Sequence, residues 1–132
     1  MDFENQARIL VAEDDQVFAE ILRFQLSRQG FEVVVVHDGE SGHRLSQSEH
    51  FDLIITDYQM PKRNGEFVCL GARSTEINSA TPIFMCTAKG YEVDTHRLRE
   101  EFRIAEFFLK PFSPTELITK VNNALEVDTP AE

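Results

Sequence analysis

Charged and hydroxyl side chains follow four of the short apolar runs in this sequence of 132 residues. These groups are Glu13-Asp14-Asp15, Thr56-Asp57, Thr87-Ala88-Lys89 and Lys110-Pro111. Each group alone has an ordinary explanation as a helix cap, a turn or a solvated lysine. Their occurrence one after another along the chain favours a single site that contains several carboxylates, a hydroxyl and an ammonium group.

The clustered carboxylates predict a bound metal ion. Two negative charges about 4 Å apart repel each other by ~4 kcal/mol at an effective dielectric constant of about 20, so such a cluster needs a compensating cation. Oxygen ligands without histidine or cysteine favour a hard ion, and a few carboxylates suit Mg²⁺ better than Ca²⁺, with Mn²⁺ as a substitute. A further carboxylate beside such an ion can attack phosphorus while the ion and a lysine neutralise the phosphoryl oxygens. Asp57 is the candidate nucleophile.

The apolar runs in front of these groups have the length and composition of buried β-strands. They are continuous rather than alternating, and β-branched or aromatic, which is typical of parallel strands that are covered on both faces. The five runs in the sequence cover residues 9–12, 33–36, 53–55, 83–86 and 107–109. Ligands of such sheets bind at the carboxyl ends of the strands, so the charged groups converge if the first strand lies between the second and the third.

Helix-length segments separate the apolar runs. The first segment places four apolar residues at helical spacing before a closing glycine: Val17, Ile21, Leu22, Leu26 and Gly30. The last begins with the capping sequence Ser113-Pro114-Thr115-Glu116. The middle helices are expected to be thinner or more mobile, because Gly42 and Gly71 interrupt two of them and the one near residues 93–101 is mostly polar. The alternation predicts an α/β fold, a single-domain doubly wound five-stranded parallel sheet with five helices.

The composition and the charge pattern argue against several classes of protein. Thirteen Lys and Arg residues against 23 Asp and Glu residues leave no basic tract, so direct contact with nucleic acid is not expected. No apolar run approaches a membrane span, and the acidic start is no signal peptide. The cysteines Cys69 and Cys86 are expected to be buried free thiols, which indicates a cytoplasmic protein. We expect one domain over residues 8–126, with tails at 1–7 and 127–132.

The motifs resemble those of the receiver domain of bacterial two-component response regulators, the CheY-like domains. The resemblance rests on these segments: Ile9-Leu10-Val11-Ala12-Glu13-Asp14-Asp15, Asp52-Leu53-Ile54-Ile55-Thr56-Asp57-Tyr58-Gln59-Met60-Pro61, Asn64-Gly65, Thr87-Ala88 and Lys110-Pro111-Phe112. It extends from Arg8 to about Glu126 and implies the strand order 2-1-3-4-5.

The resemblance also implies roles for individual residues. Asp57 would accept a phosphoryl group, and Lys110 would pair with its oxygens. Asp14, Asp15, Asp57 and the backbone carbonyl of Gln59 would hold Mg²⁺. Thr87 and Phe107 would move in response, and a cis Lys110-Pro111 bond would aim the lysine into the cleft. Phe107 stands where many relatives carry tyrosine, so it would switch without a hydroxyl.

The function implied is that of a phosphoacceptor signalling module, which catalyses only its own phosphorylation and dephosphorylation. The partners implied are a histidine kinase or histidine phosphotransfer protein, a downstream effector or attached output domain, and a second copy of the chain. They would meet a face made of the fourth helix, the fifth strand and the fifth helix. Two alternatives stay open: an interaction scaffold independent of phosphorylation, and a Mg²⁺-dependent aspartyl-phosphate phosphatase. Against the phosphatase, Gln59 occupies the position where such enzymes usually carry a second acid.

Overall fold

The computed structural model describes residues 6–88 and 93–125, and in this part of the chain strands and helices alternate. The strands are β1 (Arg8–Ala12), β2 (Glu32–Val36), β3 (Leu53–Asp57), β4 (Ile83–Ala88) and β5 (Glu106–Lys110). The helices are α1 (Gln16–Arg28), α2 (Gly39–Ser48), α3 (Gly65–Arg73), α4 (Thr95–Phe102) and α5 (Pro114–Ala124). In this described part, no helix is both long and apolar enough to cross a membrane.

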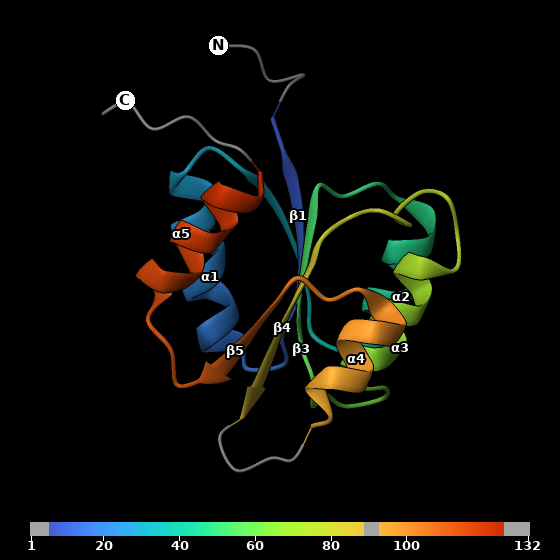
Figure 1. Ribbon diagram of the computed structural model, residues 1–132. Coiled ribbons are helices and arrows are strands. Elements are labelled where there is room, and N and C mark those ends of the chain that lie inside the picture. The colour runs from blue at the N-terminus through green and yellow to red at the C-terminus, as the bar shows by residue number, and fades with distance from the viewer. Residues whose placement is uncertain (1–5, 89–92, 126–132) are drawn as a thin grey trace.

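The strands form one parallel sheet in the order β2-β1-β3-β4-β5. Helices α1 and α5 cover one face, and α2, α3 and α4 cover the other (Figure 1). The predicted doubly wound sheet is therefore confirmed, including the order 2-1-3-4-5. Because β1 lies between β2 and β3, the residues after β1 and β3 meet at one edge of the sheet.

The sheet separates two apolar clusters. Along β1, Ile9 and Val11 belong to the cluster that also contains residues of α1 and α5, whereas Leu10 and Ala12 belong to the cluster of α2, α3 and α4. This alternation follows from the twofold side-chain period of a strand. The expectation of complete burial holds for the central strands only, because the edge strands β2 and β5 each pair with one neighbouring strand and are partly exposed.

Helix α1 begins at an aspartate cap and buries only part of the predicted apolar set. Its buried residues are Ala19, Leu22 and Leu26, whereas the side chains of Val17 and Ile21 are 72% and 42% exposed. The small side chain of Ala19 lets the helix approach the sheet, and this orientation turns the larger pair outward. The prediction that Val17 and Ile21 belong to the buried face is therefore wrong.

The glycines of α2 and α3 let these helices pack closely, and both helices continue through them, so the prediction that Gly42 and Gly71 interrupt the helices is wrong. A Cβ at Gly42 would lie 2.8 Å from a methyl of Val68, and one at Gly71 would meet the hydroxyl of Ser46. The two glycines thus allow α2 and α3 to approach each other. The ring of His43 also stacks on Phe67 with 3.8 Å between centroids.

The described part of the N-terminal segment makes more contacts than predicted. Gln6 donates a hydrogen bond to the carbonyl of Gly30, and Ala7 packs against the cluster of α1 and α5. Of the expected tails at residues 1–7 and 127–132, residues 1–5 and 127–132 lie outside the described residues.

Candidate functional site

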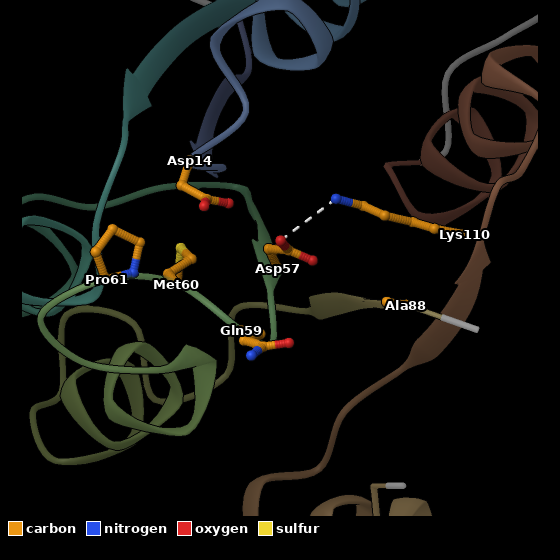
Figure 2. Close-up of a pocket in the computed structure, with 7 residues that line it drawn as sticks. All are labelled: Asp14, Asp57, Gln59, Met60, Pro61, Ala88 and Lys110. Carbon is orange, nitrogen blue, oxygen red and sulfur yellow. Dashed lines mark ion pairs between the residues drawn. The ribbon is translucent and has the colours of Figure 1, made fainter. Parts of the chain in front are cut away.

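A cavity of about 400 Å³ opens at the carboxyl ends of the strands (Figure 2). It is lined by Asp14, Asp57, Gln59, Met60, Pro61, Ala88 and Lys110. These residues come from the ends of β3, β4 and β5 and from the segments after β1 and β3. The sheet order therefore brings together residues that are far apart in the sequence.

Asp57 ends β3 and points into this cavity with only 8% of its surface exposed. Its Oδ2 lies 3.3 Å from Nζ of Lys110, which also donates a hydrogen bond of 2.7 Å to Oε1 of Glu13. Burial and the charge of Glu13 raise the pKa of Asp57 to about 7, although Lys110 opposes this shift. Asp57 is thus a carboxyl group near the midpoint of its titration at neutral pH.

Lys110 is the cation that balances the buried acids. Burial acts to lower the pKa of Lys110, but its hydrogen bond to Glu13 and the charge of Asp57 outweigh burial and raise that pKa. The ammonium group is therefore held in its charged form between two carboxylates. The Lys110-Pro111 peptide bond after it is cis, as predicted.

The acidic cluster consists of Glu13, Asp14 and Asp57, whose carboxylate oxygens lie within 4.8 Å of one another. Asp15 does not belong to it. Its carboxylate caps α1 and accepts hydrogen bonds from the backbone N–H groups of Val17 and Phe18. The metal-binding role of Asp15 stays a prediction, and in this structure the cap turns its side chain to the start of the helix.

Glu13 is the residue that sequence reasoning missed. It is buried, it accepts from Lys110, and its second oxygen accepts the N–H of Asp15 at 3.0 Å. The strand register contains the missing signal: Ala12 pairs with Thr56, so the next residue on β1 is level with Asp57. An aspartate directly before a helical segment is also the usual N-cap, which explains the role of Asp15.

Thr87 and Gln59 lie beside Asp57 on the neighbouring segments. Thr87 is 7% exposed, and its buried hydroxyl has no hydrogen-bond partner among the residues that the structure describes. A buried hydroxyl without a partner is costly, so this group is suited to donate to a molecule bound at the strand ends. Gln59 lines the cavity two residues after Asp57.

Phe107 lies on β5 at a distance from the acids. Its ring is partly buried against the cluster of α2, α3 and α4, and the guanidinium carbon of Arg99 stands 4.9 Å from the ring centroid. Thus Asp57, Lys110, Asp14 and Gln59 gather at one cavity with Thr87 beside it, whereas Phe107 connects β5 to α4.

The arrangement suits attack on an electrophile with anionic oxygens. One carboxylate faces a cavity, an ammonium group lies beside it, and two more acids can hold a hard cation that offsets the charge of the attacking group and its substrate. Every candidate metal donor here is an oxygen, and this donor set fits Mg²⁺.

Comparison with known proteins identifies a single family. The family model described as "response regulator receiver domain" matches residues 9–122. The chain is 35% identical over 118 residues to the alkaline phosphatase synthesis transcriptional regulatory protein PhoP of Bacillus subtilis, covering 89% of this chain and 48% of that protein. It therefore spans about half the length of this relative.

Solved structures have the same fold. A putative response regulator from Chloroflexus aurantiacus superposes with a TM-score of 0.80 at 29% identity, covering 92% of this chain and 99% of that one. The receiver domain of the sensor histidine kinase PA1611 from Pseudomonas aeruginosa, solved with a magnesium ion coordinated in its active-site cleft, also gives a TM-score of 0.80, at 24% identity and with 92% of this chain and 98% of that one covered.

Proposed function

The chain belongs to the response regulator receiver domain family, and from this premise we propose that Asp57 accepts a phosphoryl group from a histidine kinase or a histidine phosphotransfer protein. The observation that carries the proposal is the buried carboxylate of Asp57, which faces the cavity 3.3 Å from the ammonium group of Lys110. Lys110 favours the ionised form of Asp57 and lies where it can pair with a phosphoryl oxygen.

In the transfer step, a carboxylate oxygen of Asp57 attacks the phosphorus of a phosphohistidine. The new O–P bond forms as the P–N bond breaks, and the imidazole nitrogen leaves with the electron pair. The product is an acyl phosphate on Asp57. Its added charge of about −1.5 to −2 favours any movement that brings a donor to it, and the unpaired hydroxyl of Thr87 is such a donor.

We assign the magnesium ligands to Glu13, Asp14, Asp57 and the backbone carbonyl of Gln59. The mutual approach of the three carboxylates and the oxygen-only donor set support this assignment, as does the Mg²⁺ bound by the same fold in the PA1611 receiver domain. When bound, Mg²⁺ supplies positive charge that neutralises the phosphoryl oxygens during transfer. Mn²⁺ prefers similar ligands and is the second ion to test.

The output surface that we propose consists of α4, β5 and α5, where an effector, an attached output domain or a second copy would bind. Leu109 of β5 is 55% exposed there, and Phe107 connects the strand to Arg99 of α4. A change at Lys110 would reach this surface along β5.

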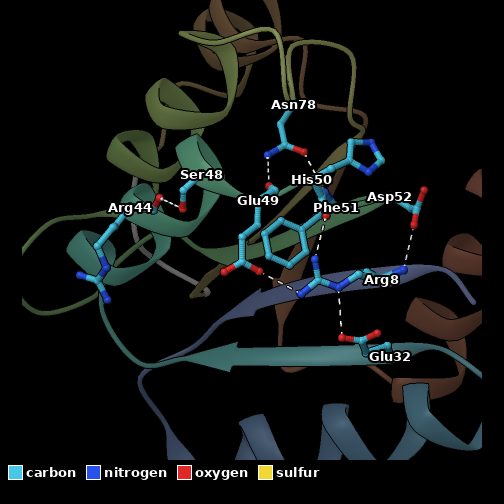
Figure 3. Close-up of polar contacts among 9 residues, drawn as sticks. All are labelled: Arg8, Glu32, Arg44, Ser48, Glu49, His50, Phe51, Asp52 and Asn78. Carbon is cyan, nitrogen blue, oxygen red and sulfur yellow. Dashed lines mark hydrogen bonds and ion pairs between the residues drawn. The ribbon is translucent and has the colours of Figure 1, made fainter.

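Incubation with acetyl phosphate tests the phosphoacceptor role. We expect intact-mass spectrometry to detect one phosphoryl adduct on the wild type with Mg²⁺ and none with EDTA or on Asp57→Asn. Asp52→Asn is the matched control and should keep the adduct, because it makes the same chemical change at the other end of β3, where Asp52 accepts the N–H of Arg8 (Figure 3). An unmodified wild type, or an adduct that persists in Asp57→Asn, contradicts the proposal. Gel filtration of the same samples detects dimerisation as an output.

A further inference from the structure

Helix α4 is attached to the domain by few buried side chains. Leu98 and Phe102 are its buried residues, and the remainder of the helix is exposed. Such a short helix depends on its polar contacts for position, because burial of two side chains stabilises it less than the packing of α1 or α3 stabilises those helices. Its arginines are therefore the side chains that can anchor it through polar contacts.

Arg97, in the first turn of α4, reaches Glu66 in the first turn of α3. Its Nη2 donates to Oε2 of Glu66 at 2.9 Å, and the hydroxyl of Tyr58 donates to the same oxygen at 3.0 Å. Nη1 of Arg97 donates separately to Glu101 within α4. One carboxylate oxygen thus joins α4 to the residue that directly follows Asp57, and we call this set the Tyr58–Glu66–Arg97 network.

The backbone of Tyr58 is fixed to the site. Its N–H donates to the carbonyl of Cys86 on β4 at 2.8 Å, and its carbonyl accepts the N–H of Gly65 at 2.6 Å. A shift of the Tyr58 backbone is therefore also a shift of the chain at the end of β3. The network transmits such a movement to α4 through Glu66, because both donors share its Oε2.

We propose that Arg97 is a positioning residue, which holds α4 in the phosphate-free arrangement through Glu66 and Tyr58. The inference rests on the proposed phosphoacceptor function, since it states how a group on Asp57 would be sensed at α4. A contact that stabilises one of two arrangements opposes the change to the other, so loss of Arg97 shifts the equilibrium toward the phosphorylated arrangement.

Hydrogen exchange of the phosphate-free protein tests the network without any phosphodonor. We expect amides of residues 95–102 to exchange about two- to fivefold faster in Arg97→Ala, because the ion pairs with Glu66 and Glu101 are lost. Tyr58→Phe should cause a smaller increase in α4, and the double variant no more than Arg97→Ala alone. Arg23→Ala is the matched control: its side chain is 47% exposed against 45% for Arg97, and its ion pair with Glu20 lies within α1. Glu101→Gln removes the other partner of Arg97 and should leave α4 exchange near the wild-type rate.

Binding of beryllofluoride with Mg²⁺, a mimic of the phosphoryl group, tests the coupling. We expect Arg97→Ala to bind it about two- to fivefold more tightly than the wild type, with Arg23→Ala unchanged. The positioning role alone is overturned if the α4 amides of Arg97→Ala exchange at the wild-type rate. It is also overturned if the wild type binds beryllofluoride and Arg97→Ala binds it with the same affinity. A wild type that takes neither beryllofluoride nor phosphate overturns the proposed function as well, whatever the exchange rates are.

Discussion

At the scale of single residues, the charge on Asp57 opposes folding. Its pKa of about 7 lies above the ordinary value of 3.8, so between these pH values the folded state binds more protons than the unfolded chain. The free energy of unfolding should therefore fall as the pH rises through this window, with the full penalty above pH of about 7. Asp57→Asn removes it and should stabilise the metal-free protein at pH 8 by on the order of 2–4 kcal/mol.

Urea unfolding in EDTA measures this effect. The stability difference between Asp57→Asn and the wild type should shrink steadily from pH 8 to pH 4, because the wild-type carboxyl group becomes neutral. A difference that is the same at both pH values would show that the substitution acts through packing and not through charge.

Glu13 and Asp15, two of the three acids after β1, should differ in their effect on metal binding. Glu13 is in the acidic cluster, so Glu13→Gln should weaken Mg²⁺ binding by about tenfold or more at pH 8, because the cluster loses a charged ligand. Asp15→Asn should leave the affinity unchanged, since asparagine caps a helix as well as aspartate does. Isothermal titration calorimetry with Mg²⁺ measures the affinity of each variant. A larger loss of affinity in Asp15→Asn than in Glu13→Gln would identify Asp15 as the ligand.

At the scale of elements, the junction of β3 and α3 depends on a glycine. A Cβ at Gly65 would collide with the carbonyl oxygen of Asp57, so Gly65→Ala must push the end of β3 away from α3. We expect a loss of about 1–3 kcal/mol in stability and a slower reaction with acetyl phosphate. Gly30→Ala is the control, because Gly30 has a φ of +97° but no atom within 4 Å of a new Cβ. It should lower stability by about 1 kcal/mol and leave the phosphorylation rate unchanged. Equal rates in both variants would contradict the argument.

The helices and strands also show which features of the fold could be predicted from the sequence. Strands and capped helices were predictable because their signals are local: continuous apolar runs, and the Ser113-Pro114 start of α5. The face of α1 was not, because the burial of Ala19 in place of Val17 depends on how closely the helix approaches the sheet. The roles of Glu13 and Asp15 likewise depend on strand register and cap geometry, which a run of three acidic residues does not reveal.

At the scale of the whole molecule, Mg²⁺ binding and folding are expected to be linked equilibria. A ligand that binds the folded state alone stabilises it by mass action, so each tenfold increase in Mg²⁺ above its dissociation constant should add about 1.4 kcal/mol to the free energy of unfolding. The acidic cluster draws its acids from the chain after β1 and from the end of β3, which meet only when the sheet is formed. Urea unfolding at pH 8 over a Mg²⁺ series measures the slope. Asp14→Asn should flatten it, whereas Asp94→Asn, at the exposed cap of α4, should keep it. An equal slope in both variants would mean that the ion binds elsewhere, and a flat line for the wild type would mean that the folded acids do not hold Mg²⁺ at all.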